Sequence, residues 1–77
     1  MSIRIRYFAS LKDYIGRTED ILDYCPQTTV LQLWQAANRD KALPDNVLIA
    51  VNMEYVALTT VVEDGDEVAF FPPVTGG

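Results

Sequence analysis

The sequence has 77 residues, the size of one small domain, and 49% of them are hydrophobic, as in an ordinary globular protein. Eleven acidic against six basic side chains give a net charge of −5, which disfavours nucleic acid and anionic membranes and favours a basic protein partner. The sequence shows no run of about 18 apolar residues and no apolar leader, so we expect a cytoplasmic protein without membrane contact.

The side chains that usually perform catalysis are scarce in this chain. It has no histidine, the usual general base and metal ligand, and we predict neither a metal site nor a permanently bound cofactor. Its one cysteine, Cys25, cannot form an internal disulfide and has no Lys or Arg near it in the sequence to stabilise a thiolate. We therefore interpret Cys25 as a structural thiol and not as a reactive one.

The first 26 residues predict two strands separated by a short helical turn. Apolar and polar side chains alternate over residues 2–8, as in a half-buried strand. One face carries Ile3, Ile5 and Tyr7, and the other face carries Arg4, Arg6 and Phe8. A helical turn over residues 11–15 is expected to end at Gly16. Residues 20–24 predict a second, less regular strand, which Pro26 ends.

The main helix is expected to begin after Thr29. Thr29 and Gln32 have the spacing of a capping box, in which each side chain bonds to the other residue's backbone N–H. An apolar stripe with the spacing i, i+3, i+4 and i+7 follows, formed by Val30, Leu33, Trp34 and Ala37. Such a stripe packs on a sheet, so we interpret Trp34 as a core residue and not as a platform for a ligand.

The second half of the chain predicts short strands and tight turns. In order, these are a strand at 47–51, a turn at 52–54, a strand at 55–58, a turn at 64–66 and a strand at 67–71. Two strands, a helix and several further strands are typical of an α+β roll with one main helix across a mixed sheet. This is the β-grasp (ubiquitin-like) arrangement, which we expect to form a single domain over residues 1–77.

The last residues predict an extended C-terminal tail over residues 72–77. Pro72 and Pro73 hold the backbone extended, so the tail can reach about 20 Å at roughly 3.3–3.6 Å per residue. The final glycines have no Cβ and can pass a narrow channel to approach a bound nucleotide. We expect the carboxylate of Gly77 to be the functional group of the chain. The alternative is that the tail is a frayed terminus without a function. The residues expected to enter a partner's pocket with it are Pro72, Pro73, Val74, Thr75 and Gly76.

The size, the strand order and the ending DGDEVAFFPPVTGG (residues 64–77) resemble the small, sulfur-carrier subunits of molybdopterin synthase. The resemblance covers the whole chain and includes YFA at residues 7–9 and IAVN at residues 49–52. Residues 64–77 are its most specific part, because a Gly-Gly ending alone would indicate only the wider ubiquitin-like group. Residues 17–46 carry little of the family's signature.

The resemblance implies that a separate E1-like activating enzyme adenylates the carboxylate of Gly77 with ATP. A sulfur donor protein then converts it into a thiocarboxylate. The tail enters the large subunit of a heterotetrameric synthase, where the sulfur attacks cyclic pyranopterin monophosphate. Two such transfers build the dithiolene that later binds molybdenum. The catalytic pocket is thus expected on the large subunit, and this chain needs no side-chain base.

Strand alternation predicts which side chains contact that partner. Phe8 lies on the arginine side of its strand, and Phe71 lies on the side opposite Val68 and Phe70. Tyr55 faces outward if Val56 faces inward. We expect Phe8, Tyr55 and Phe71 to form an exposed apolar patch at the root of the tail, of the kind that marks an interface. For Phe8 and Phe71, burial under a loop is the alternative.

Three other functions are compatible with parts of the pattern. A sulfur carrier of the thiamine pathway shares the fold, the Gly-Gly ending and the activation chemistry. A ubiquitin-like modifier uses the same activated carboxylate of Gly77 to form an amide with a target lysine. A pure interaction domain would keep the aromatic patch but has no need for two terminal glycines.

Overall fold

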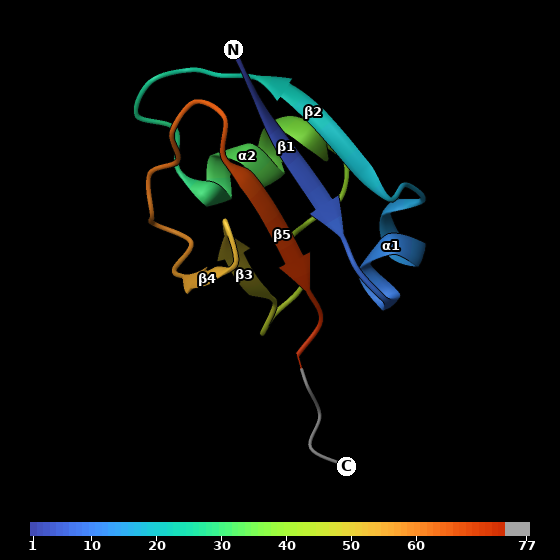
Figure 1. The fold of residues 1–77 in the computed structure, drawn as a ribbon. Helices are drawn as coiled ribbons and strands as arrows, with labels where there is room; N and C mark the ends of the chain where they lie inside the picture. The colour runs from blue at the N-terminus through green and yellow to red at the C-terminus, as the bar shows by residue number, and fades with distance from the viewer. Residues whose placement is uncertain (74–77) are drawn as a thin grey trace.

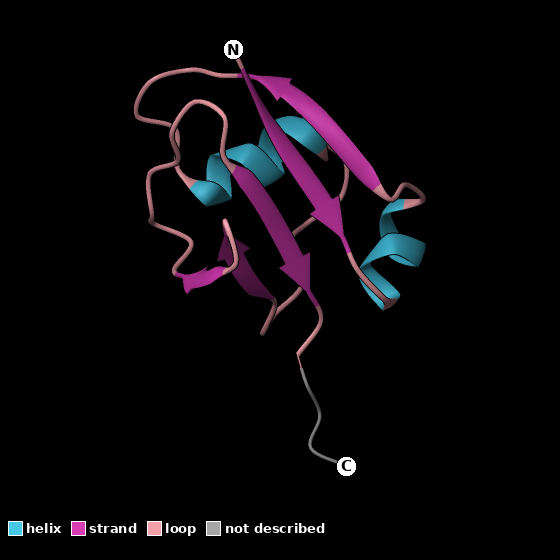
Figure 2. Cartoon of the chain, viewed as in Figure 1, coloured by secondary structure: helices cyan, strands magenta, loops and turns pink. Residues whose placement is uncertain are grey.

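The structure is a computed structural model in which residues 1–73 are described (Figure 1). Its elements in chain order are β1 (Ser2–Tyr7), α1 (Ser10–Ile15), β2 (Glu19–Asp23), α2 (Val30–Ala37), β3 (Leu48–Val51), β4 (Glu54–Val56) and β5 (Glu67–Phe71). The strands form a mixed sheet in the order β2-β1-β5-β3-β4, with β1 and β5 parallel and the other neighbouring pairs antiparallel. Figure 2 shows α2 lying across one face of this sheet, which confirms the predicted α+β roll.

The core lies between α2 and the sheet. The apolar face of β1 is buried there as predicted, and Trp34 on α2 is only 1% exposed. The Trp34 ring contacts the rings of Tyr7 and Phe70 edge-on, with centroids 5.9 and 5.1 Å away. Its indole Nε1–H donates a hydrogen bond of 2.9 Å to the carbonyl of Lys41. Trp34 is therefore a core residue, and its one polar group is satisfied.

The helix ends follow from local sequence signals. At the start of α2, the N–H of Gln32 donates to Thr29 Oγ1 at 3.2 Å, and the N–H of Thr29 donates to Gln32 Oε1 at 2.9 Å. This is the predicted capping box. The short helix α1 ends at Gly16, whose φ of 84° lies in the left-handed region that favours glycine.

Several element boundaries differ from the sequence predictions by one or two residues. The turn between β3 and β4 has two residues, because Asn52 and Met53 both have positive φ, at 50° and 72°. Glu54 therefore belongs to β4, where it pairs with Val51, and β4 ends at Val56 instead of reaching residue 58. Leu58 lies outside the strand because its carbonyl accepts the N–H of Leu31.

The remaining boundary differences are shifts of one residue. The first strand ends at Tyr7, one residue before Phe8, and β2 begins at Glu19, which pairs with Arg6. The third strand begins at Leu48, which pairs with Phe71. In each case the partner strand decides where pairing starts or stops, and the local pattern carries no information about it.

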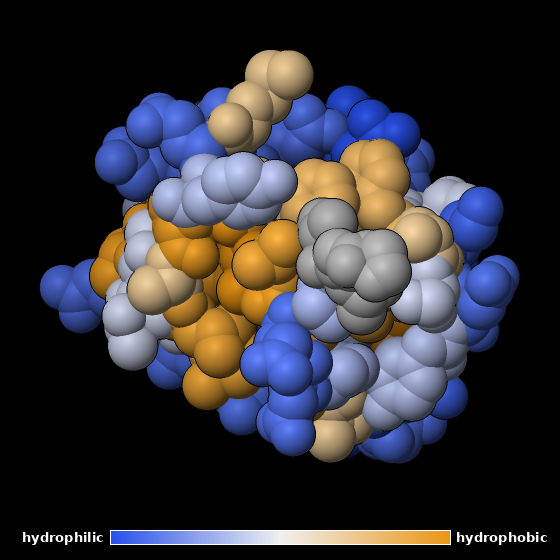
Figure 3. Space-filling model, turned by 90° about the horizontal axis from the view of Figure 1, so that it is seen from below, coloured by the Kyte–Doolittle hydropathy of each residue, from blue (hydrophilic) through white to orange (hydrophobic). Residues whose placement is uncertain are grey.

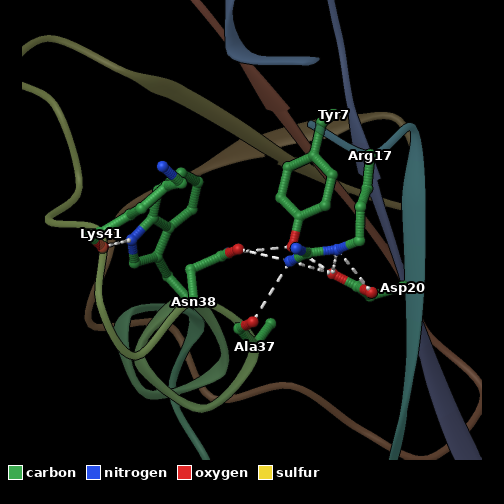
Figure 4. A network of polar contacts seen from close by, with 7 residues as sticks. Tyr7, Arg17, Asp20, Ala37, Asn38 and Lys41 are labelled. Carbon is green, nitrogen blue, oxygen red and sulfur yellow. Dashed lines mark hydrogen bonds and ion pairs between the residues drawn. The ribbon is translucent and has the colours of Figure 1, made fainter. Parts of the chain in front are cut away.

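A polar network that the sequence did not predict joins β1, β2 and the end of α2 (Figure 4). Asn38 is 4% exposed and donates from Nδ2 to the Tyr7 hydroxyl at 3.0 Å, and that hydroxyl donates to Asp20 Oδ2 at 2.8 Å. Arg17 donates to Asn38 Oδ1 at 2.6 Å and forms an ion pair with Asp20 at 2.8 Å. Burial is the largest cause that raises the pKa of Tyr7 to about 12, so its hydroxyl stays protonated at neutral pH. The network fixes α2 against the β1–β2 edge of the sheet.

Candidate functional site

The face of the sheet that α2 does not cover, called here the open face, carries the aromatic residues selected from the sequence. Residues paired directly across a sheet point to the same face. One such row runs from Arg6 through Ala69 and Ala50 to Tyr55. Phe71 follows Ala69 at the strand spacing of two residues, and it pairs with Leu48. The open face is therefore largely apolar at the end of β5.

Phe8, Tyr55 and Phe71 lie together there and form what we call the aromatic cluster. The rings of Phe8 and Phe71 stack with centroids 4.8 Å apart and planes inclined by 14°. The ring of Tyr55 lies 6.4 Å from that of Phe71. Tyr55 is 73% exposed, whereas Phe8 and Phe71 are half-buried, as expected for two rings that cover one another. The predicted outward orientation is confirmed, and contact of these residues with a partner stays a prediction.

Charged side chains border the aromatic cluster. The guanidinium of Arg6 lies 5.5 Å above the centre of the Phe8 ring, a distance at which a cation is attracted to an aromatic face. Arg6 also forms an ion pair of 3.5 Å with Glu67. Figure 3 shows the end of the molecule where β5 finishes, with hydrophobic side chains gathered in a broad area and hydrophilic ones around it. An apolar centre with a charged rim is typical of a protein interface.

The chain leaves the sheet beside this cluster. The N–H of Phe8 donates to the carbonyl of Phe70 at 3.2 Å, which holds the end of β5 against β1. Pro72 is half-buried and Pro73 is exposed. The other residues selected for the tail, Val74, Thr75, Gly76 and Gly77, lie outside the described residues. The insertion of Pro72 and Pro73 into a partner therefore remains an expectation from the sequence.

The surface position of Cys25 corrects the view that it has a structural role. Cys25 is exposed in the loop between β2 and α2, so its thiol does not fill the core. Its carbonyl accepts a hydrogen bond of 2.8 Å from Thr28 Oγ1, which orders the loop through the backbone and not through the sulfur.

Neither a metal site nor a membrane helix is found in residues 1–73. Their Cys, Asp and Glu side chains form no group of three or more that could hold a metal ion. None of the helices in this part of the chain combines the length and the apolar character needed to cross a membrane.

Sequence reasoning missed Leu48 and Ala50 as parts of the open face. The segment 48–51 is a continuous apolar run, so no alternation shows which side chains face outward. Their pairing with Phe71 and Ala69 supplies that information. The outward-facing side chains of residues 48–51 can therefore be identified only when the pairing with the neighbouring strand is known.

Comparisons with known proteins agree on one family. The model of the ThiS family matches residues 5–77. A curated Escherichia coli (strain K12) protein named molybdopterin synthase sulfur carrier subunit is 42% identical over 81 residues, covering 97% of this chain and 99% of that protein.

Solved structures with the same fold include a small archaeal modifier protein and a complex of molybdopterin-converting factor subunits. The small archaeal modifier protein 1 of Haloferax volcanii has a TM-score of 0.77 at 27% identity, covering 95% of this chain and 98% of its own. A complex of subunits 1 and 2 of the molybdopterin-converting factor from Helicobacter pylori contains a chain with a TM-score of 0.67 at 23% identity, with both chains covered in full. At 23% identity this second similarity establishes the fold alone.

Proposed function

Because the chain belongs to the ThiS family, we propose that it is the sulfur-carrier subunit of a molybdopterin synthase and acts in molybdenum cofactor biosynthesis. The observation that carries the proposal is the 42% identity to the Escherichia coli sulfur carrier subunit over 97% of the chain. The aromatic cluster supports it independently, since it supplies a docking surface where the chain leaves the sheet toward residues 74–77.

In the proposed reaction, the group that carries sulfur is the carboxylate of Gly77. A carboxylate oxygen attacks the α-phosphate of ATP in an E1-like activating enzyme, pyrophosphate leaves, and an acyl-adenylate forms. A sulfur nucleophile delivered by a donor protein then displaces AMP at the acyl carbon. The resulting thiocarboxylate is ionised at neutral pH, so its sulfur is nucleophilic without help from a base on this chain.

The second half of the proposed reaction takes place in the large subunit. The tail enters the large subunit's pocket, and the sulfur attacks cyclic pyranopterin monophosphate there. Water then cleaves the bond between the sulfur and the acyl carbon, which leaves the sulfur on the pterin and regenerates the carboxylate of Gly77. The phosphate of the precursor and the thiocarboxylate are both anions, so a basic pocket suits them and also suits a chain with a net charge of −5. Docking through the aromatic cluster fixes where the tail begins, which limits the positions that Gly77 can reach.

Reconstitution from purified components tests this function. The chain is combined with the activating enzyme, ATP, the sulfur donor, the large subunit and the pterin precursor. We expect molybdopterin to form only when every component is present. A chain that acquires sulfur but never supports this synthesis would instead be a carrier for another pathway, such as that of thiamine.

Substitution of Phe71 tests the docking surface. We expect Phe71→Ala to weaken the complex with the large subunit by about 2 kcal/mol, as for an aromatic interface residue. Folding stability is expected to fall by only about 1 kcal/mol, because the stacking on Phe8 is lost while the core stays intact. Calorimetric titration paired with a denaturation curve separates the two effects.

Phe71→Leu is the matched control because it keeps most of the apolar area and is expected to bind better than Phe71→Ala. If Phe71→Ala lost stability but kept the affinity of the folded protein, the open face would not be the docking surface.

Cys25 offers a rival route for sulfur, because thiols readily accept persulfide sulfur. We expect Cys25→Ser to form the thiocarboxylate at Gly77 and to support synthase turnover at close to the parental rate. Stability should be nearly unchanged, since the thiol is exposed. Mass spectrometry of the loaded protein and a turnover assay check both points. A Cys25→Ser protein that is adenylated but never acquires sulfur would make Cys25 a relay residue.

Protein modification is a second candidate function, favoured by the similarity to small archaeal modifier protein 1. It uses the same acyl-adenylate, with a lysine amine instead of sulfur as the attacking group. A tagged chain produced in its host distinguishes the two functions. Conjugates with an amide bond between Gly77 and target lysines would support modification, and their absence alongside thiocarboxylate formation would support the carrier function alone.

A further inference from the structure

The turn between β3 and β4 holds an apolar side chain out into solvent. Met53 is 95% exposed, more than any other large hydrophobic residue in the described part of the chain. Its φ of 72° lies in the left-handed region, which glycine adopts freely and a long side chain adopts at a cost. Two-residue hairpin turns with positive φ at both positions prefer Asn-Gly, and here the second residue is Met. Neither burial nor backbone geometry explains this choice.

Hydrogen bonds hold the turn rigidly to the start of β5. The N–H of Asn52 donates to the carbonyl of Glu67 at 2.9 Å, and the N–H of Glu67 donates to Asn52 Oδ1 at 3.0 Å. Asn52 Nδ2 donates to Asp66 Oδ1 at 2.8 Å. Because the backbone is fixed next to Met53, a partner that binds its side chain does not have to order the turn.

Met53 lies close in the chain to the aromatic cluster. It precedes Tyr55 by two residues, so the backbones of the two residues are at most about 7 Å apart, at roughly 3.3–3.6 Å per residue. Tyr55 contacts Phe71 on the open face. Two strongly exposed apolar side chains, Tyr55 and Met53, therefore lie within a short distance of one another along the chain, and a partner seated on the aromatic cluster comes close to Met53.

Two carboxylates belong to residues next to the turn that holds Met53. Glu54 follows Met53 directly, and the Asp66 carboxylate accepts from the Asn52 side chain, whereas the Glu67 carboxylate is already paired with Arg6. Asp66 also accepts the N–H of Glu63 at 2.7 Å, which holds its carboxylate beside the turn. The surface complementary to this arrangement is an apolar socket with basic side chains at its rim.

We propose that Met53 is a docking residue that inserts into an apolar, basic-rimmed socket on the large subunit of the synthase. This inference rests on the proposed function, because it takes the large subunit as the partner on the open face. Methionine suits the role, since its unbranched thioether adapts to the shape of an apolar socket. The docking surface then has two anchors, the aromatic cluster at the root of the tail and Met53 at the far end of β4.

Met53→Gly tests the proposal without endangering the fold. Glycine removes the side chain and accepts the positive φ, so we expect the melting temperature to stay the same or rise. Affinity for the purified large subunit, measured by calorimetric titration, is expected to fall about tenfold, which corresponds to about 1.4 kcal/mol. The matched control is Val61→Ala, which trims a side chain that is 51% exposed beside Thr29 and is expected to leave the affinity unchanged.

Charge substitutions at the same position test the basic rim. An apolar socket disfavours both Met53→Glu and Met53→Lys, but a basic rim makes the lysine variant the weaker binder. Equal binding by the two would overturn the basic rim. Parental affinity in Met53→Gly, together with weakened binding in Phe71→Ala, would overturn the role of Met53 and leave the proposed function standing. A parental chain that does not bind the large subunit at all would instead overturn the proposed function.

Discussion

Deletion of Gly77 is expected to abolish sulfur loading and molybdopterin formation while the melting temperature stays nearly unchanged. Without Gly77 the chain carries its carboxylate on Gly76, about 3.3–3.6 Å short of the reacting position in the activating enzyme. A misplacement of about 1 Å can already cost roughly 10²-fold in rate. Stability is expected to be spared because, within residues 1–73, the buried hydrophobic residues lie between Ile3 and Phe70. Mass spectrometry after incubation with activating enzyme, ATP and sulfur donor gives the result.

Two related variants separate position from bulk at the end of the chain. An extra residue after Gly77 is expected to block loading as completely as the deletion, because the carboxylate again misses the reacting position. Gly76→Leu keeps the length but adds a side chain that a narrow channel excludes, so its adenylation should be impaired. Full activity of the deletion would refute the carrier function, and normal adenylation of Gly76→Leu would refute only the steric role of glycine.

Trp34→Ala is expected to lower the free energy of unfolding by about 3–5 kcal/mol, the largest stability effect that we predict for a single substitution. The indole is almost fully buried, packs edge-on against Tyr7 and Phe70, and donates to the Lys41 carbonyl. Truncation leaves a cavity and an unsatisfied carbonyl in the same place. Chemical denaturation followed by circular dichroism measures the loss.

Trp34→Phe is the control, since it keeps a large ring and gives up mainly the indole hydrogen bond, so its loss should be smaller. The molecules of the Trp34→Ala variant that remain folded are expected to bind the large subunit normally, because Trp34 packs on the opposite face of the sheet from the aromatic cluster. A loss in Trp34→Ala below about 1 kcal/mol would contradict the description of the core.

Those parts of the fold that depend on neighbouring residues in the sequence could be predicted. The alternation over residues 2–8 assigned the two faces of the first strand, and the spacing of Thr29 and Gln32 placed the start of the main helix. The outward orientation of Phe8 and Phe71 followed from the same alternation. In these cases the structure depends on residues that are close in the sequence, so the local pattern is sufficient to predict it.

The features that could not be predicted from the sequence depend on contacts between distant segments or on unusual backbone geometry. Asn38 lies 31 residues from Tyr7 in the sequence, and no local pattern links the two side chains. The boundary of β4 was misplaced because Asn52 and Met53 adopt positive φ without a glycine to indicate it. The stacking of Phe8 on Phe71 likewise required the parallel pairing of β1 and β5.

The most direct test of the proposed function is the mass of the chain isolated from its own host while the host makes molybdenum cofactor. The carrier function predicts that part of the protein contains one sulfur in place of one oxygen. Fragmentation should place this sulfur at the carboxylate of Gly77. A chain that carries only the ordinary carboxylate, in cells whose molybdopterin synthesis requires it, would contradict the proposal that Gly77 carries the sulfur.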